Sequence, residues 1–314
     1  MKRVANNTMS TDLEETASTT SCASCGICQV DDIKLKKCAA CKSIRYCSVT
    51  CQREHRPQHK ADCKKRVAEL RDEILFRQPE SSHLGDCPIC LLPLSLDVQK
   101  SPMQSCCSKV ICNGCMVASI LHKGGKNYAC PFCRHEYSKD DKTETDVNVM
   151  KRIEVNDPVA IRESAIRHGK SSDLGTAMEY FKKAAALGDA EAHYQLGMSY
   201  TIGRGVERDA KKEKYHMEEA AIGGHPAARD AVGVMEMRMG NEDRAVKHFI
   251  IAATLGHDGA MDSLRMGHAL GGVRKEDVDI ALGAYQAAVD ATKSPQRDIA
   301  EKYLAEFEEF QEMS

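Results

Sequence analysis

The second half of the chain carries a repeated pattern of small and apolar positions. An Ala-Ala-x2-Gly motif begins at Ala184, Ala220 and Ala252, at spacings of 36 and 32 residues, with a large apolar residue three positions before each copy. A period in this range is typical of stacked helix pairs that bury their apolar faces against one another, and glycine commonly ends such helices. We therefore predict an all-α solenoid over 157–293, with units at 157–188, 189–224 and 225–256 and a degenerate unit at 257–293.

Two further amphipathic patterns predict single helices. Apolar residues from Val67 to Leu75 recur at helical spacing between charges. We therefore predict that 64–86 is a linker containing one short helix, and that Pro79 ends this helix. After Ser294, an apolar stripe predicts a final helix over 294–314, which we expect to cap the exposed end of the solenoid. The stripe consists of Ile299, Tyr303, Leu304, Phe307 and Phe310.

The polar stretches predict no packed element. Residues 1–24 are rich in Ser, Thr, Asn and acidic side chains and have few large apolar ones, so we expect a disordered tail there. We expect an exposed linker over 135–156, because it contains the charged run 138–146. The alternation from Val147 to Val155 is too weak to predict an element.

The chain has 16 cysteines, all between Cys22 and Cys133. Most form pairs with two intervening residues, a spacing that lets two sulfurs bind one ion from a tight turn, and Zn²⁺ takes four such ligands. Five pairs and six further residues fill four zinc sites and leave Cys22 as a spare cysteine, since a site using Cys22 would strand Cys28. The pairs are Cys25/Cys28, Cys38/Cys41, Cys87/Cys90, Cys112/Cys115 and Cys130/Cys133, and the further residues are Cys47, Cys51, His59, Cys63, Cys106 and Cys107.

Composition narrows the class of protein. The first thirty residues hold no apolar run typical of a signal peptide, and no run of eighteen apolar residues occurs. We therefore expect an intracellular protein, cytoplasmic or nuclear, whose cysteines stay available to metal, in preference to a disulfide-rich secreted module. Tryptophan is absent and aromatic residues make up 5% of the chain, so we expect the zinc modules to fold largely on metal-binding free energy.

Residues 25–63 resemble the MYND zinc finger. The Tyr46-Cys47-Ser48-x2-Cys51 run and the closing His59-Lys60-x2-Cys63 carry the resemblance, with eight ligands in the family's order. The family implies two interleaved sites, and His55 departs from it, since an aromatic residue is usual there. We read His55 as a surface or packing histidine. The implied sites are Cys25, Cys28, Cys47 and Cys51, and Cys38, Cys41, His59 and Cys63.

The basic side chains of this module do not by themselves predict nucleic-acid binding. The net charge of the whole chain is −2, and no aromatic residues interleave the basic positions, as stacking against bases would require. MYND fingers are mostly protein-interaction modules that often bind proline-rich peptides. A peptide partner is therefore favoured over nucleic acid, and no membrane partner is expected.

Residues 87–134 resemble a RING-type finger, through Cys87-Pro88-Ile89-Cys90 at the start and Cys130-Pro131-Phe132-Cys133 at the end. The family implies an α+β module with two cross-braced sites. Lys109 stands at the usual histidine position, so Cys106 and Cys107 are the expected substitutes, with His122 as a weaker alternative. The implied sites are Cys87, Cys90, Cys112 and Cys115, and Cys106, Cys107, Cys130 and Cys133.

The RING resemblance also implies a function. Such fingers recruit a ubiquitin-conjugating enzyme and hold its thioester in a reactive pose, which is catalysis by positioning without a catalytic nucleophile. By position, Ile89 and Pro131 would contact the conjugating enzyme, and Arg134 would bridge it to ubiquitin. The alternative is that the first two only pack the zinc loops and that Arg134 is a solvated charge.

The repeats resemble Sel-one-like repeats, relatives of the tetratricopeptide repeat. The run Leu196-Gly197-x2-Tyr200-x2-Gly203-x-Gly205-Val206 carries this resemblance. The fold class is therefore multidomain: two small cross-braced zinc modules followed by a helical solenoid whose groove offers a peptide site. Two functions stay open, a RING-type ubiquitin ligase and a non-catalytic zinc-dependent adaptor, and a nucleic-acid regulator is the least favoured third.

Overall fold

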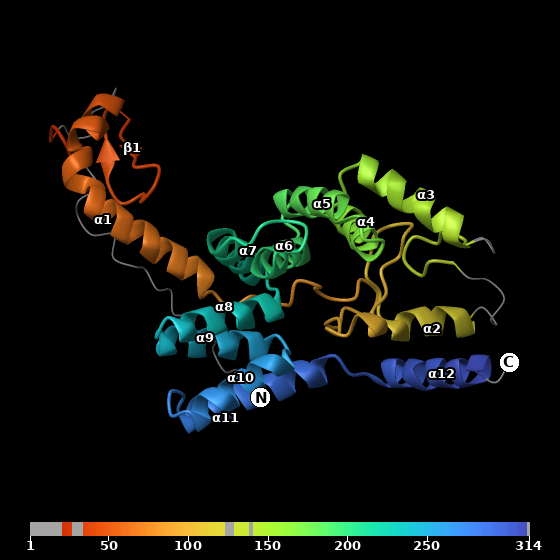
Figure 1. Ribbon diagram of the computed structural model, residues 1–314. Coiled ribbons are helices and arrows are strands. Elements are labelled where there is room, and N and C mark those ends of the chain that lie inside the picture. Colours follow the sequence, from red (N-terminus) through yellow and green to blue (C-terminus); the bar gives the residue numbers. More distant parts are fainter. Residues whose placement is uncertain (1–20, 27–33, 123–128, 138–140, 313–314) are drawn as a thin grey trace, which may run out of the picture. The chain divides into compact units, whose positions relative to one another are not determined.

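The computed structural model describes residues 21–26, 34–122, 129–137 and 141–312, without the side chains of 141–143 and 307–312 (Figure 1). The chain divides into two compact units, Met1–Ile74 and Leu75–Ser314. The expected tail at 1–24 lies almost wholly outside the described residues. Within the described ranges, every helix is too short or too polar to cross a lipid bilayer.

The first unit contains a small cysteine-rich module built around one β-hairpin. Strand β1 (Lys36–Lys37) pairs antiparallel with β2 (Arg45–Tyr46), with Lys36 opposite Tyr46. Helix α1 (Val49–Leu75) follows and is a single helix, so the separate helix predicted for the linker is the end of α1. The small core of the unit consists of Cys22, Leu35, Cys38, Cys41 and Tyr46.

The second zinc module opens the second unit and has little regular structure. It contains a 3-10 turn, η1 (Val98–Lys100), and helix α2 (Asn113–His122). Three isolated antiparallel bridges join Asp86 to Pro93, Met103 to Val110 and Ala129 to Glu136. Its core is made of cysteines and a few aliphatic residues, including Leu94 and Ile111, as expected of a module too small to fold on apolar burial alone.

The repeats form a helical solenoid, as predicted. Each unit is a helix pair, and in the first three units the second helix ends before a glycine with positive φ, namely Gly188, Gly224 and Gly256. Aspartates accept backbone hydrogen bonds at the start of the first four helices. The helices are α4 (Pro158–Lys170), α5 (Leu174–Ala186), α6 (Ala190–Ile202), α7 (Ala210–Ile222), α8 (Pro226–Arg238), α9 (Glu242–Thr254), α10 (Asp258–Ala269) and α11 (Lys275–Ala291).

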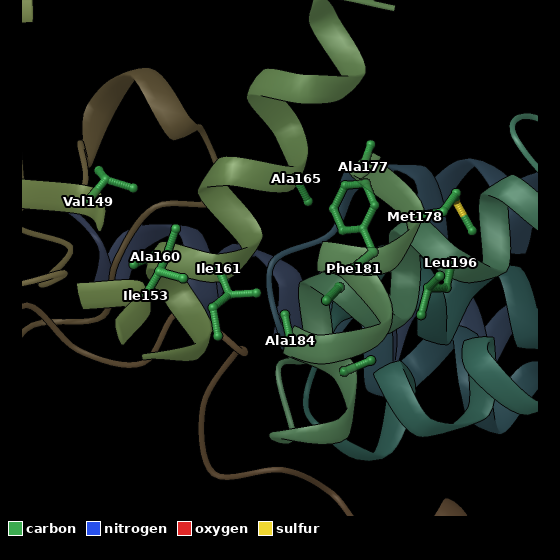
Figure 2. Packing of buried hydrophobic residues seen from close by; sticks show 12 residues of the cluster. Val149, Ile153, Ala160, Ile161, Ala165, Ala177, Met178, Phe181, Ala184 and Leu196 are labelled. Carbon is green, nitrogen blue, oxygen red and sulfur yellow. The ribbon is translucent and has the colours of Figure 1, made fainter. Parts of the chain in front are cut away.

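The alanines of the repeat motif lie where neighbouring helices approach. Ala184, Ala220 and Ala252 are fully buried. In the first units, Met178 and Phe181 of α5 pack with Leu196 of α6 (Figure 2). The small-residue pattern is therefore a packing pattern, with one large apolar side chain per pair filling the space between helices.

The stretch expected as a linker at 135–156 contains helix α3 (Asp141–Glu154). Val149 and Ile153, one turn apart, are buried in the same cluster as Ile161 of α4 (Figure 2). The expectation of an exposed linker is therefore wrong for this part. The weak alternation was the mark of a helix that buries a single narrow stripe.

The final helix, α12 (Pro295–Glu312), does not cap the solenoid. It packs beside α2 of the second zinc module, where Gln296 donates to the carbonyl of Gly114 at 3.1 Å (Figure 1). Ile299 of the predicted stripe is exposed and Ala300 is buried, while the side chains of Phe307 and Phe310 lie outside the described residues. The expected cap is corrected, because a stripe of apolar residues does not reveal which surface covers it.

Candidate metal centres

Four groups of cysteine and histidine side chains converge in the described residues, two in each zinc module. Within each group the donor atoms all lie within 4.8 Å of one another, and the closest pairs are 3.3–3.9 Å apart. Four sulfurs each about 2.3 Å from a central Zn²⁺ would be separated by roughly 3.8 Å along each edge of their tetrahedron. The spacing therefore matches tetrahedral zinc centres.

In the first group, Cys25, Cys47 and Cys51 come together with Cys22. Cys25 Sγ lies 3.6 Å from Cys47 Sγ, and Cys47 Sγ lies 3.5 Å from Cys51 Sγ. Our reading of Cys22 as a spare cysteine is corrected: its side chain is buried in the core of the module. Cys28, which we expected in this site, lies outside the described residues.

The second group joins Cys38, Cys41, His59 and Cys63. Nε2 of His59 lies 3.3 Å from Cys41 Sγ. His55 stacks on the ring of His59, with centroids 5.9 Å apart, and its Nδ1 lies 3.1 Å from the hydroxyl of Tyr46. His55 and Tyr46 thus pack against a candidate ligand, which limits the orientations open to its imidazole ring.

In the second module, the first and third pairs of cysteines along the chain form one group, and the second and fourth pairs form the other. Cys87 and Cys90 meet Cys112 and Cys115, with sulfur–sulfur distances of 3.8 Å. The other group is Cys106, Cys107, Cys130 and Cys133, in which Cys133 lies 3.3 Å from Cys106 and Cys107 lies 3.9 Å from Cys130. His122, at the exposed end of α2, belongs to none of the groups found among the described residues.

A single backbone turn recurs at these groups. The amide of the residue four positions after the first cysteine donates to that cysteine's carbonyl at 2.9 Å, and this residue has positive φ. The donors are Gly26, Lys42, Leu91 and Arg134, after Cys22, Cys38, Cys87 and Cys130. Gly26 suits its place in the turn of Cys22 and Cys25, because glycine adopts this left-handed conformation without strain.

A fifth turn of the same form has a glutamine in place of its first cysteine. The amide of Ser108 donates to the carbonyl of Gln104 at 2.7 Å, with φ of +56° at Ser108. Cys107 holds the usual second position, and Cys106 supplies the sulfur that Gln104 lacks. The Gln104 side chain instead accepts from the hydroxyl of Tyr137 at 2.6 Å. This substitution accounts for the adjacent cysteines in the sequence.

Each of the four turns that begin with a cysteine lowers the pKa of that first cysteine. Burial opposes ionisation of the first cysteine, but hydrogen bonds from the amides of its own turn outweigh it, so the pKa falls to about 6 for Cys22 and Cys38. The same balance lowers the pKa of Cys87 and Cys130 to about 7. A thiolate that is already favoured near neutral pH is a ready ligand for a divalent cation.

Cys47, Cys63 and Cys107 resist ionisation, because other sulfurs lie close to each of them. Hydrogen bonds with Cys25 and Cys51 raise the pKa of Cys47 to about 12. Burial and then neighbouring sulfurs raise the pKa of Cys63 and Cys107 to about 11. A cation between them removes this repulsion. The donors therefore fit Zn²⁺, and four protein ligands leave no open position, which is typical of structural zinc.

The residues expected to meet a conjugating enzyme lie on the surface of the second module. Ile89 is 41% exposed, Pro131 is half-buried and Arg134 is exposed. Phe132, beside Pro131, is 44% exposed. Large apolar side chains that remain this accessible on so small a module are candidates for a contact surface.

One further group, which the sequence did not predict, joins His83 of the linker to Glu191 and His225 of the solenoid. Nδ1 of His225 accepts the amide of Ala228 at 3.1 Å, so Nε2 of the neutral ring carries the proton and donates to Glu191 at 2.9 Å. That proton occupies the lone pair a metal would need. Burial opposes ionisation of Glu191, but hydrogen bonds from His225 and His83 outweigh it and lower its pKa far below the ordinary value.

This group holds the linker on the solenoid. The His83 amide donates to the carbonyl of Gly224 at 2.9 Å, and the His83 ring stacks on His225 with centroids 4.3 Å apart. Earlier in the linker, Phe76 packs on His248, and the fully buried guanidinium of Arg229 donates to the carbonyl of Leu75. The segment from Leu75 to His83 is therefore bound along helices of the second and third repeats.

Comparisons with known proteins agree with part of this picture. Residues 22–63 match the MYND finger, starting at Cys22, and residues 165–189, 190–225 and 235–257 match the Sel1 repeat. An uncharacterized protein of Neisseria meningitidis serogroup B is 39% identical over 59 residues, which span 19% of this chain and 13% of that relative. Both resemblances, to the MYND finger and to the Sel1 repeat, are confirmed.

Solved structures with some similarity are also repeat proteins. A protective antigen of uropathogenic Escherichia coli with an SLR fold is 29% identical, at a TM-score of 0.40, over 47% of this chain and 33% of that one. A Sel1 repeat protein from Oxalobacter formigenes is 25% identical, at a TM-score of 0.36, over 38% of this chain and 96% of that one. The family matches thus identify a zinc-binding MYND finger and Sel1 repeats in one chain, a combination that serves protein interaction.

Proposed function

We propose that this protein is a RING-type ubiquitin ligase in which the MYND finger and the Sel1 solenoid select the substrate. A role in protein interaction follows from the two matched modules, and the ligase activity is the step beyond it. The observation that carries the proposal is the alternating order in which the second module gathers its cysteines. This cross-brace keeps two loops at a fixed separation without a large core, as a positioning surface requires.

The proposed mechanism needs no nucleophile from this chain. Ile89 and Pro131 would bind the conjugating enzyme through apolar contact, each from a different zinc loop. Arg134 would use its guanidinium fork to hold ubiquitin against that enzyme. Zinc bound by the two groups of four cysteines would supply rigidity, so that the thioester is presented in a reactive orientation. We further propose two ions in each module, four in all.

Autoubiquitination with a panel of conjugating enzymes tests this proposal. The zinc-loaded wild type is expected to form chains, and Ile89→Ala is expected to abolish them or reduce them at least about tenfold, as loss of a buried apolar anchor does. Arg134→Asn removes the guanidinium while keeping a residue that tolerates the left-handed backbone at this position. Val98→Ala is the matched control, since Val98 is 75% exposed on the same module but outside the zinc loops.

If a folded, zinc-loaded wild type forms no chains with any enzyme of the panel, the ligase proposal fails and the protein is an adaptor. Chains that persist in both Ile89→Ala and Arg134→Asn would equally reject the assigned surface. We place the proposed activity in the cytoplasm or nucleus, because reduced cysteines are maintained there.

A further inference from the structure

The side chain of Arg297, near the start of α12, enters the first zinc turn of the second module. Its guanidinium donates to the carbonyls of Leu92 at 3.2 Å, Pro93 at 2.7 Å and Thr292 at 2.6 Å. The same group lies 3.5 Å from Sγ of Cys90. A planar fork held by three carbonyls has one orientation, and in that orientation an N–H points at a candidate zinc ligand.

The chain makes room for this contact with small residues. Gly114 of α2 faces Arg297 so closely that an added Cβ would lie 2.9 Å from Cγ of Arg297 and 3.1 Å from its backbone nitrogen. Ala300, one turn later on α12, is fully buried. Gln296 fixes the register by donating to the carbonyl of Gly114. The two helices lie side by side at a distance that brings Arg297 to the metal site (Figure 1).

The charge of the site explains why a cation belongs there. Four thiolates around one Zn²⁺ carry a net charge of about −2, and Cys87, Cys112 and Cys115 are nearly inaccessible to water. A buried net charge is costly unless N–H donors or opposite charges meet it. Amides of the zinc turn point at Cys87, and Arg297 brings a full positive charge to Cys90.

We propose that Arg297 is a positioning residue of the zinc centre formed by Cys87, Cys90, Cys112 and Cys115, and that it couples docking of α12 to zinc retention. The docked helix holds the guanidinium against Cys90, and the metal-bound thiolate holds the guanidinium in return. Such coupling is reciprocal: whatever the helix adds to zinc affinity, zinc adds to docking of the helix. The inference concerns the metal centre and does not depend on ligase activity.

The first test is the rate at which the full-length, zinc-loaded protein releases zinc to a chromogenic chelator. Arg297→Gln is expected to speed the release of about one zinc equivalent by roughly tenfold, the usual effect of losing a hydrogen bond to a metal ligand. Arg297→Lys keeps the charge but not the fork, so it is expected to fall between this variant and the wild type. Glu301→Gln is the control, because it removes only the exposed contact of α12 with Lys100.

The second test measures how zinc removal affects the docking of α12. Zinc removal from the wild type is expected to expose the 291–296 connection to protease and to leave the solenoid folded by circular dichroism. The proposal is overturned by wild-type release rates in a folded Arg297→Gln protein, or by unchanged protection of 291–296 after zinc removal. Equal acceleration in Arg297→Gln and Glu301→Gln would also overturn it, since helix docking in general, and not the contact with Cys90, would then govern zinc loss.

Discussion

At the scale of single residues, the choice of ligand depends on backbone conformation as much as on spacing. Cys22/Cys25 and Cys25/Cys28 have the same spacing, so counting cysteines did not distinguish them. In each turn described, a residue with positive φ directly follows the second cysteine, and Gly26 fills this place after Cys25 without strain. The glycine therefore favours a turn formed by Cys22 and Cys25.

Substitution of Cys22 should cost one zinc ion. Cys22→Ser removes a buried sulfur whose pKa is lowered to about 6, so metal analysis of the purified protein should show about one equivalent less than the wild type. Cys28→Ser is the matched control, because the group already holds four donors without it, and it should leave the zinc content unchanged. The reverse result would restore Cys28 as the ligand.

The half-buried pair of histidines in the second repeat, His193 and His216, should make the solenoid sensitive to acid. Nδ1 of His193 lies 3.0 Å from Nδ1 of His216. Burial lowers the pKa of both, and the charge of His193 further lowers the pKa of His216, to about 4. The unfolded chain binds protons below about pH 6.5, whereas the folded chain resists them. Stability conferred by the neutral pair is thus present above about pH 6.5 and lost as the pH falls toward about 4.

Urea unfolding at pH 7.5 and pH 5.0 measures this effect. His216→Gln replaces the titrating ring with a neutral amide, so the loss of unfolding free energy between the two pH values should shrink by about 2 kcal/mol. The exposed His122 is a suitable control, and His122→Gln should keep the wild-type difference. Comparing variants removes the contribution of zinc ligands, which protonate in every sample. An unchanged difference in His216→Gln would contradict the prediction.

At the scale of elements, the connection between the zinc modules is itself a bound segment. The sequence predicted a linker without chemistry, yet its residues from Leu75 to His83 contact α6, α8, α9 and the turn at Gly224. Periodicity finds the helices of a solenoid, because each repeat shows the same apolar register. It does not find what binds between repeats, since His83 lies more than a hundred positions before Glu191 and His225.

Gly224→Ala should release this segment. Gly224 has φ of +80°, and an added Cβ would lie 2.9 Å from the carbonyl oxygen of Ser81. Gly240 has φ of +79° at the end of α8 and nothing within 4 Å of an added Cβ. Both variants should lose about 1 kcal/mol from backbone strain, but only Gly224→Ala should also make residues 77–86 sensitive to protease. Equal protection of that segment in the two variants would mean that it tolerates displacement.

At the scale of the whole molecule, sequence reasoning found the MYND finger and the Sel1 repeats but not the contacts of the linker and of α12. The order of eight ligands and a repeat period of 32 to 36 residues each reflect local constraints: a ligand must sit on a tight turn, and a repeat must bury the same face. The helix at 295–312 was predicted too, but not its place on α2. That contact depends on Gly114 and Arg297, which are 183 positions apart and form no recognisable motif.

Removal of zinc should therefore unfold the zinc modules, which depend on metal, and leave the solenoid folded, because apolar packing holds it. Helices α4 to α11 contain none of the four candidate zinc groups and are held by buried apolar clusters. The zinc modules have cores made largely of the ligands themselves. Treatment with a strong chelator should leave most of the helical circular dichroism and a cooperative thermal transition, while residues 34–63 and 87–122 become accessible to protease.

The amount of helical structure lost after chelation tells whether the solenoid and the zinc modules unfold together or separately. If the solenoid unfolds with the zinc modules, then the contacts of the linker and of α12 carry more of its stability than its own helix pairs do. Double substitution with Gly224→Ala and Arg297→Gln weakens both contacts without removing a zinc ligand. In that variant the solenoid transition measured after chelation should fall only about 1 kcal/mol below the wild-type one, which is the backbone strain expected of Gly224→Ala alone, because distant and independent contributions to stability add.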